Sequence, residues 1–529
     1  MIASILLERF PFMNNNTVLK LLATFVVVAA LAVTTGAAIA VLQLIFSVDI
    51  YRDAANVYAF MARSLAAGDR ADAVHPAIPS FNVLLAQPLI RMGLRPEQAL
   101  SALSSLFYLA TVPCLYVLLR RFVPETPAAF GALLFACAPK IIRFSCTGLI
   151  DSGKIFFLVT GLYCADRMIE SKFRSYKYAL WFGVALGGVS LARSEGVGNA
   201  FIVFGCVGIF WLYRSFREKR VMPLLPSVVT VAVWVLAILS RMWVNWHFCG
   251  KFIFDSRMNW LLRSLLSRPA VKASASAAAS AAPEGGPSSL MVWWEFLNGF
   301  IRGTGEVYFG FALAGLLLLA LASRGGKLRI LWPDKKIPEF FGWRGFYFIL
   351  LAMAVGNAFI FKMSGVVAYR YFLPNIPLLM VFIVIAAYWL WSWIGKLFPR
   401  PLRMVGGAAV AGVLVFQAVN GAENIFTRFS RRQHRSGIAA GEAMRSVNPD
   451  GKVWFLLTSS IEWYHSGMRR AVPVETPQPD LCRFADFDFV LIAKEDEEET
   501  RIIASRKDVE EIPLFSDSTV RLFRKIKVK

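Results

Sequence analysis

Long apolar segments alternate with short charged segments along most of this chain of 529 residues. The first apolar segment runs from Thr17 to Val48 and contains a single charged residue, Lys20. About 20 apolar residues in a helix are enough to cross the roughly 30 Å of hydrocarbon in a bilayer. The apolar core of a signal peptide has only about 7–15 residues, so we interpret this first segment as a retained membrane span.

The same pattern predicts about eleven membrane-spanning helices, since an open chain can satisfy its backbone hydrogen bonds in lipid only as helices. These spans are expected at residues 18–47, 101–120, 125–145, 154–168, 178–193, 199–213, 222–245, 305–323, 344–362, 370–395 and 403–420. Residues 1–424 are therefore predicted to form a polytopic membrane domain. Within it, residues 48–100 are expected to carry interfacial helices, and residues 246–304 to form a flexible outer loop.

From residue 425 onward the pattern changes to short apolar runs in a charged background. The runs "KVWFLLT", "FDFVLIAK", "EIPLF" and "TVRLFRK" predict strands, and "GIAAGEAMRSV" predicts a helix before them. The predicted fold class is thus an all-α membrane protein with a small C-terminal α/β domain outside the membrane, residues 425–529.

The distribution of charge predicts the topology. The net charge of +22 could indicate a nucleic-acid-binding protein, but such a surface would interleave basic and aromatic residues in a soluble region. Here the basic residues occur at every second connector between spans, which is typical of cytoplasmic loops. The N-terminus is therefore expected in the cytoplasm and, with an odd number of spans, the C-terminal domain in the periplasm. The seven cysteines form no CxxC pair, so neither a metal site nor a disulfide framework is indicated.

Charged side chains at span ends on the outer side form the candidate site. They are Asp49, Asp53, Lys140, Arg143, Asp151, Arg193, Glu195, Arg241, His247, Lys362 and Arg370. Arginine can bind a phosphate through two parallel hydrogen bonds, and a carboxylate can accept a proton from an acceptor hydroxyl. The same cations would stabilise a departing lipid phosphate. This combination favours glycosyl transfer from a lipid-linked donor at the membrane surface.

Four stretches give the chain a resemblance to a known family: "HPAIPSFNVLLAQPLIRMG", "FACAPKIIRFSCTGLIDSGKIFFLVTGLY", "SLARSEGV" and "YRYFLPNIPLLMVF". In their order and spacing they resemble the membrane glycosyltransferases of the GT-C fold, which use lipid-phosphate sugars. The resemblance covers residues 15–430 and is nearest to protein mannosyltransferase-like and aminoarabinose transferase-like proteins.

The resemblance implies catalytic roles for two aspartates. An acid of the first outer loop acts as the base in that family, which here matches Asp53, and a second acid of the next outer loop matches Asp151. The family often has Asp-Glu where this chain has Asp53-Ala54, and Tyr58 stands one residue further on than expected. Asp49 therefore remains an alternative base. Both Asp53 and Asp151 could instead cap the helices that follow them, because Asp is a favoured N-cap.

The resemblance also implies a set of substrate-binding residues: Asp49, Tyr58, His75, Arg193, Glu195, Arg370 and Tyr371. Arg193 and Arg370 are expected to hold the donor phosphate. The structural alternatives are a turn at His75, an ion pair within the loop of Arg193 and Glu195, and an interfacial position for Arg370.

We therefore expect an inverting glycosyltransferase in the bacterial inner membrane. It would take a sugar from a polyprenyl-phosphate-linked donor and pass it to a hydroxyl or amine of a lipid, glycan or protein on the outer face. The expected reaction needs no cofactor. Whether a divalent cation binds at Asp53 is a question that the sequence leaves open. The alternatives are an enzyme like O-antigen ligases and polymerases, and a lipid or solute transporter. A transporter would more typically bury such charges in the middle of interrupted helices.

Overall fold

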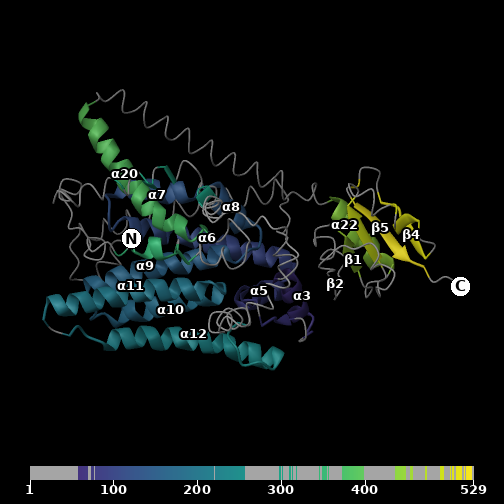
Figure 1. The fold of residues 1–529 in the computed structure, drawn as a ribbon, viewed down its shortest axis with the longest axis horizontal. Coiled ribbons are helices and arrows are strands. Elements are labelled where there is room, and N and C mark those ends of the chain that lie inside the picture. Colours follow the sequence, from purple (N-terminus) through teal and green to yellow (C-terminus); the bar gives the residue numbers. More distant parts are fainter. Residues whose placement is uncertain are drawn as a thin grey trace, which may run out of the picture.

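The computed structural model contains a helical bundle and, beside it, a small β-sheet (Figure 1). The described residues are 58–69, 73–76, 78–136, 138–219, 221–255, 297–298, 301, 309–310, 312–313, 317, 345, 348–353, 355–356, 372–397, 435–447, 453–456, 471–472, 489–493, 501, 503–505, 508–514, 518 and 520–526. The predicted spans 18–47 and 403–420 lie outside this set, and the predicted spans 305–323 and 344–362 and the predicted outer loop 246–304 lie in it only in part.

Six predicted spans are observed as helices. They are α6 (Pro96–Leu119), α9 (Asp151–Glu170), α10 (Tyr176–Ala192), α11 (Gly196–Arg217), α12 (Leu225–Cys249) and α20 (Asn375–Leu397). Among the described residues, α6, α11 and α12 are long and apolar enough to cross a membrane. The total of eleven spans stays a prediction.

The predicted span 125–145 is replaced by two helices, α7 (Glu125–Ala136) and α8 (Pro139–Cys146). Ala138 between them is extended, with φ −66° and ψ 117°. A residue before proline is pushed out of the helical region, and proline itself has no N–H to continue the helical hydrogen bonds. Hydropathy cannot show this break, because both sides of Pro139 are apolar.

Helix ends follow local sequence signals. Pro96 occupies the first turn of α6, where no N–H is needed, and Gln98 accepts a hydrogen bond from the Arg95 N–H at 3.2 Å. Ser175 caps α10 by accepting the Tyr178 N–H. Gly250 ends α12 in the left-handed conformation, with φ 67°.

Helix α10 packs closely against α12. A β-carbon on Gly183 would lie 2.7 Å from the Thr230 carbonyl oxygen, and one on Gly187 would lie 2.6 Å from Ala237 Cβ. Small residues four positions apart let membrane helices approach in this way. The Trp234 indole N–H also donates to Ser190 Oγ at 2.9 Å. Residue numbers rise together along the two helices at these contacts, so α10 and α12 run in the same direction. Both helices therefore finish at the same end of the bundle.

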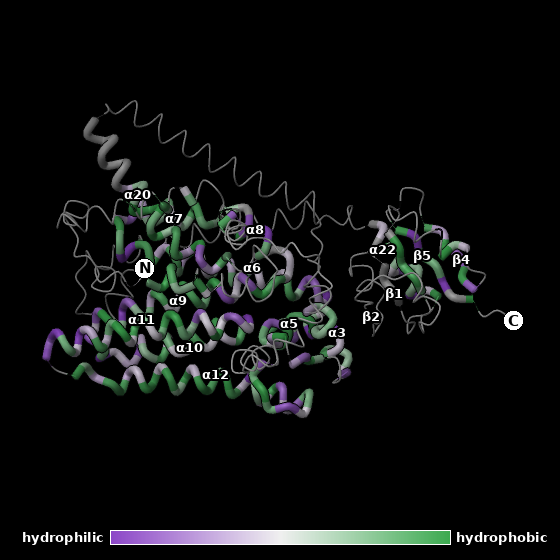
Figure 2. Tube along the Cα trace, in the orientation of Figure 1, coloured by the Kyte–Doolittle hydropathy of each residue, from purple (hydrophilic) through white to green (hydrophobic). Residues whose placement is uncertain are grey.

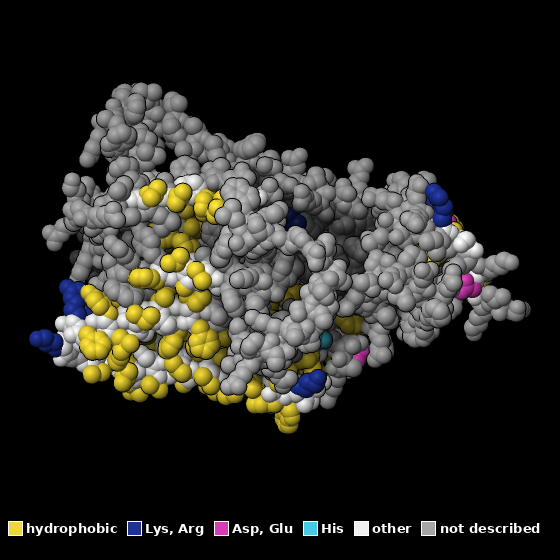
Figure 3. Space-filling model, viewed as in Figure 1, with side chains coloured by type: hydrophobic (Ala, Val, Ile, Leu, Met, Phe, Trp, Pro, Cys, Tyr) yellow, Lys and Arg dark blue, Asp and Glu magenta, His cyan; other side chains and the backbone are white. Residues whose placement is uncertain are grey.

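The lower face of the bundle in Figure 3 is covered by apolar side chains from α10, α11 and α12. Exposed examples are Leu180, Trp181, Phe201, Ile209, Leu212, Leu236 and Trp243. Figure 2 shows hydrophobic positions running along the lengths of the same helices. An apolar surface this extensive is expected where helices face lipid rather than water.

Two helices of the predicted interfacial segment are observed, α3 (Phe60–Ala66) and α5 (Phe81–Arg91). They pack together through Met61 and Val83, and the Gln87 side chain donates to the Ala62 carbonyl at 3.2 Å. The Cys249 thiol donates to the Val74 carbonyl at 3.3 Å. The first predicted outer loop therefore lies against the end of α12, while its position at the membrane surface stays a prediction.

The predicted C-terminal strands are present in a five-stranded sheet of order β2-β1-β3-β5-β4. The elements are α22 (Arg435–Val447), β1 (Val453–Leu456), β2 (Ala471–Val472), β3 (Phe489–Ala493), β4 (Val509–Ile512) and β5 (Val520–Lys525). Strands β2, β1 and β3 are parallel, and β5 is antiparallel to β3 and β4. Met444 of α22 and Leu491 of β3 share a buried cluster, against which Phe60 of α3 packs. The location of this unit outside the membrane stays a prediction.

Candidate functional site

Four charged side chains form one buried network at the end of the bundle where α10 and α12 finish. Arg193 Nη1 lies 2.7 Å from Asp151 Oδ1, and Arg193 Nε is paired with Glu195 Oε1. Lys154 Nζ lies 3.4 Å from the same Glu195 oxygen. The side chains of Asp151 and Lys154 are 2% and 1% exposed. Two cations and two carboxylates thus neutralise one another with little exposure to water, since Arg193 is 9% and Glu195 15% exposed.

The network joins two helix beginnings. Asp151 is the first residue of α9, where a negative charge is favoured by the partial positive charge of the helix N-terminus. Lys154 follows one turn later on the same helix, and Glu195 immediately precedes α11. In the described part of the chain, Asp151 Oδ2 and the neighbouring Ser152 Oγ have no hydrogen-bond partner. A buried carboxylate oxygen without a partner lowers the stability of the fold unless a ligand or a water molecule donates a hydrogen bond to it.

The connector between α10 and α11 is only three residues long, and Gly196 makes it possible. The Gly196 N–H donates to the Arg193 carbonyl at 2.9 Å, which closes the turn. A β-carbon on Gly196 would lie 1.9 Å from the Val189 carbonyl oxygen. Only glycine allows α11 to begin this close to the last turn of α10. The "RSEG" sequence therefore fixes Arg193 and Glu195 on one short turn.

Glu195 lies in this connector, outside both helices. Burial by itself would raise the pKa of its carboxyl, but Arg193 and Lys154 more than offset this effect. The pKa of Glu195 consequently falls from 4.5 to about 2. Glu195 is therefore ionised over the whole physiological pH range, and it serves as an anchor for the two cations rather than as a proton acceptor.

A second buried ion pair lies beside the first network. Arg241 Nη2 is 2.9 Å from Asp255 Oδ2, and Asp255 also accepts a hydrogen bond from the Ser194 hydroxyl. The Arg241 guanidinium lies over the Phe254 ring, 4.3 Å from its centroid. Asn245 Nδ2 donates to the Ile253 carbonyl at 2.8 Å, which holds this turn against α12. Because Ser194 stands between Arg193 and Glu195, the two networks are adjacent.

Arg241 retains unused hydrogen-bonding capacity. Its Nε and Nη1 have no partner within the described residues, although the side chain is almost fully buried. Tyr58 interacts electrostatically with Arg241, so the start of the first predicted outer helix lies near this pair. The arrangement supplies two N–H donors and one unpartnered carboxylate oxygen at the same end of the bundle.

The structure thus brings together three of the predicted site residues, Asp151, Arg193 and Glu195, with Tyr58 nearby. Arg193 uses Nε and Nη1 on carboxylates, so its contact with a donor phosphate stays a prediction. His75 is exposed, and its carbonyl accepts the Ile78 N–H at 3.0 Å, as in the turn interpretation.

Four other predicted residues lie outside the described part of the chain: Asp49, Asp53, Arg370 and Tyr371. Sequence reasoning missed Lys154 and Asp255. The spacing of Lys154, three residues after Asp151, was an available signal because such residues share a helix face. Asp255 had no local signal. Within the described residues, no three His, Cys, Asp or Glu side chains are grouped to hold a metal ion.

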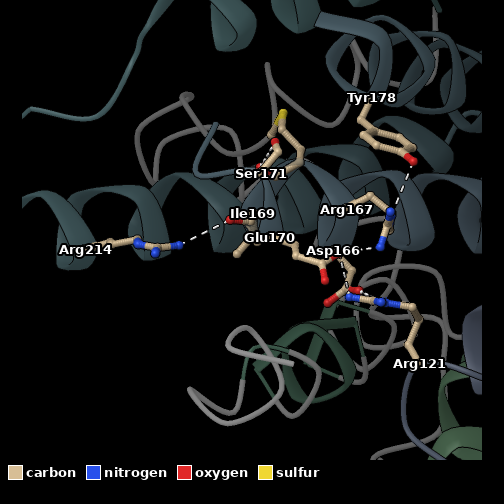
Figure 4. Close-up of polar contacts among 9 residues, drawn as sticks. Arg121, Asp166, Arg167, Ile169, Glu170, Ser171, Tyr178 and Arg214 are labelled. Carbon is tan, nitrogen blue, oxygen red and sulfur yellow. Dashed lines mark hydrogen bonds and ion pairs between the residues drawn. The ribbon is translucent and has the colours of Figure 1, made fainter. Parts of the chain in front are cut away.

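A further set of ion pairs lies at the opposite end of the bundle (Figure 4). Arg121 Nε is 2.8 Å from Asp166 Oδ2, and Arg121 Nη2 is 2.9 Å from Glu170 Oε2. Arg167 also pairs with Glu170 and donates to the Tyr178 hydroxyl at 3.3 Å. These contacts hold the connector after α6 against the end of α9. Asp166 thus has a structural role as the buried partner of Arg121.

The fold defined by this bundle matches that of membrane glycosyltransferases. No protein-family model matches the chain, and no curated protein matches its sequence. The likeness appears instead among solved structures, and the three described next are 12–14% identical to this chain.

The oligosaccharyltransferase of Archaeoglobus fulgidus in complex with Zn and sulfate superposes with a TM-score of 0.56 at 14% identity, covering 88% of this chain and 68% of that chain. AglB from the same organism, in complex with an inhibitory peptide and a dolichol-phosphate, superposes with a TM-score of 0.56 at 12% identity. The match covers 89% of this chain and 70% of that chain. ArnT from Cupriavidus metallidurans in the apo state superposes with a TM-score of 0.51 at 13% identity. The match covers 93% of this chain and 97% of that chain. The chain therefore has the GT-C fold expected from its sequence.

Proposed function

We propose that this protein is a membrane glycosyltransferase that uses a lipid-linked sugar. The donor is a sugar on a polyprenyl phosphate, and the acceptor is a hydroxyl or amine of a lipid, glycan or protein on the outer face of a bacterial inner membrane. A similar structure supports a lipid phosphate as part of the donor, because AglB of Archaeoglobus fulgidus is in complex with a dolichol-phosphate there.

The observation that carries this proposal is the buried network around Arg193. Burying four charges is costly, and a well-packed apolar core could replace them without loss of stability. Their presence at one end of an apolar bundle, with Asp151 Oδ2 unpartnered in the described part, supports a role in binding or chemistry. Arg193 and Lys154 hold both carboxylates in fixed positions, which is the preorganisation that a transferase site needs.

The proposed reaction is a single displacement. The acceptor oxygen or nitrogen attacks the anomeric carbon of the donor, and the bond from that carbon to the phosphate oxygen breaks. The proton of the acceptor passes to the carboxylate of Asp53, with Asp49 as the alternative base, and the configuration at the anomeric carbon inverts. Asp151 orients the acceptor or sugar through its unpartnered oxygen.

The leaving group is the polyprenyl phosphate, whose negative charge grows as the bond breaks. Arg370 is the sequence-based candidate for binding it, and Arg241 adds a second one. Nε and Nη1 of Arg241, which have no partner within the described residues, would donate hydrogen bonds to two phosphate oxygens in the fork geometry that suits guanidinium groups. Tyr58, His75 and Tyr371 complete the proposed substrate-binding set, and the reaction as written uses no metal.

The test is donor turnover in proteoliposomes supplied with polyprenyl-phosphate-linked hexose or aminopentose and a membrane-lipid extract as acceptor. Release of polyprenyl phosphate is measured, so the acceptor need not be known. Asp53→Asn should reduce release by about 10²–10⁴-fold, because it keeps the shape but loses the basic carboxylate. Asp151→Asn should reduce release by about 10²-fold, because it removes the charge that pairs with Arg193 and orients the substrate.

Asp69→Asn is the matched control, since it makes the same change in the same predicted outer loop after α3 and should leave turnover unchanged. Loss of activity only in Asp49→Asn would move the base to Asp49. Normal release in the variants of all three candidate aspartates would rule out the acid–base assignment.

A further inference from the structure

Among the described residues, the end of the bundle opposite the candidate site carries more cations than the carboxylates there pair with. Helices α6, α9 and α11 finish there, and the described part of this end contains four carboxylates: Glu125 at the start of α7, Asp166 and Glu170 in the last turns of α9, and Glu218 just after α11. Each carboxylate is already engaged: Glu125 with Arg120 at 2.7 Å, Asp166 with Arg121 at 2.8 Å, Glu170 with Arg121 at 2.9 Å and Glu218 with Arg214 at 2.8 Å. Part of this pairing is drawn in Figure 4.

Five exposed cations remain at this end, and we call them the basic rim: Lys172, Arg174, Lys177, Arg217 and Lys219. Within the described residues, none of them forms an ion pair, because all four carboxylates nearby are taken. The first three lie in and just after the turn from α9 to α10. Arg217 is the last residue of α11, and Lys219 lies in the turn from α11 to α12. Like charges are thus concentrated here without compensation from the described part of the protein.

Both turns are held in place rather than left loose. Arg214 Nη1 donates to the Ile169 carbonyl at 3.2 Å, which joins the end of α11 to the end of α9. Phe173 is fully buried, and its N–H donates to the Met168 carbonyl at 2.9 Å. Lys172 and Lys219 both have a left-handed backbone, with φ of 54° and 50°. Non-glycine residues keep this conformation only where the surrounding contacts impose it.

Exposed aromatic side chains lie next to the basic rim. Tyr176 is 53% exposed, Trp181 51%, Tyr213 43% and Phe216 80%. Beyond them begins the apolar face of α10, α11 and α12, and Figure 3 shows basic side chains at the edge of this face. Tyrosine and tryptophan concentrate at the level of lipid headgroups. The rim therefore stands where a lipid phosphate would be, directly beside lipid tails.

We propose that the basic rim binds the headgroups of anionic phospholipids. Each phosphate would bridge cations of the two turns while its acyl chains lie on the apolar face, so that bound lipid pins the ends of α9 and α11 together. Basic clusters beside membrane helices attract anionic lipids in this way. The surface adjoins a lipid-facing apolar surface, which favours a lipid over a soluble polyanion as its occupant. This binding is independent of glycosyl transfer.

The experiment titrates the purified full-length protein in detergent with phosphatidylglycerol, phosphatidylcholine or glycerol 3-phosphate and follows the thermal unfolding midpoint. Phosphatidylglycerol should raise the midpoint, whereas phosphatidylcholine and free glycerol 3-phosphate should not. In Arg217→Gln/Lys219→Gln, the phosphatidylglycerol concentration that gives half of the maximal midpoint shift should rise at least about tenfold. The reason is that each cation near an anionic surface increases the binding affinity about fivefold.

The matched control is Arg91→Gln/Lys251→Gln, which removes two exposed cations from the other end of the described bundle and should titrate like the unmodified protein. Lys172→Gln/Arg174→Gln/Lys177→Gln tests the turn from α9 to α10 separately. The proposal can then still be tested if the substitutions in the other turn prevent folding. The proposal is overturned if both rim variants respond to phosphatidylglycerol as the unmodified protein does. It is also overturned if phosphatidylcholine, glycerol 3-phosphate or a short DNA duplex produces the same shift.

Discussion

Gly196 offers a direct test of how the candidate site is built. In Gly196→Ala the new β-carbon would lie 1.9 Å from the Val189 carbonyl oxygen, whereas ordinary contacts begin at 3.4 Å, so α11 and the end of α10 must separate by about 1.5 Å. The obstacle is backbone, so no side-chain rotation can relieve it. Overpacking of this kind costs about 1–3 kcal/mol and sometimes more. A gain of at most about 1 kcal/mol in helix propensity offsets part of it.

The separation would also move Arg193 relative to Glu195. A misplacement of about 1 Å in a catalytic site can cost about 10²-fold in rate, so we expect donor turnover to fall by at least that factor. The assay combines thermal unfolding in detergent with release of polyprenyl phosphate in proteoliposomes.

Gly198→Ala is the matched control on the same helix, because a β-carbon there meets nothing within 4 Å. It should be neutral or slightly stabilising and fully active. Equal stability and equal turnover for the two alanine variants would refute the reasoning that a close approach at Gly196 shapes the site.

Three further predictions concern the remaining charges and the topology. Arg121→Gln should lower the free energy of unfolding by about 3 kcal/mol, since it leaves Asp166 charged and buried, and adding Asp166→Asn should recover part of that loss in thermal unfolding. Because the pKa of Glu195 is lowered to about 2, its contribution to stability is present above pH 4.5 and is lost as the pH falls towards 2; Glu195→Gln should flatten the measured dependence in this window. A reporter active only in the cytoplasm, fused after Lys529, should be silent, and a strong signal would reverse the predicted topology.

The helices could be predicted because hydropathy is a local property. A run of about 20 apolar residues forms a lipid-facing helix whatever its neighbours are, which is why the predicted spans match α6, α9 to α12 and α20. The strands β1, β3, β4 and β5 were equally visible in short apolar runs. The break at Pro139 was missed because a hydropathy pattern does not register backbone geometry, although the proline itself was a signal.

The amino-acid sequence alone shows that charged residues gather at span ends, and it was enough to propose Asp151, Arg193 and Glu195 as members of a candidate site. How these residues pair is a property of the folded bundle. Asp151 and Arg193 are 42 residues apart and meet because α9 and α10 pack side by side. Lys154 enters the same network, and Asp255 joins Arg241 across the turn after α12. Charges interact over a few ångströms, and such distances are set by packing between helices, which a one-dimensional pattern does not contain.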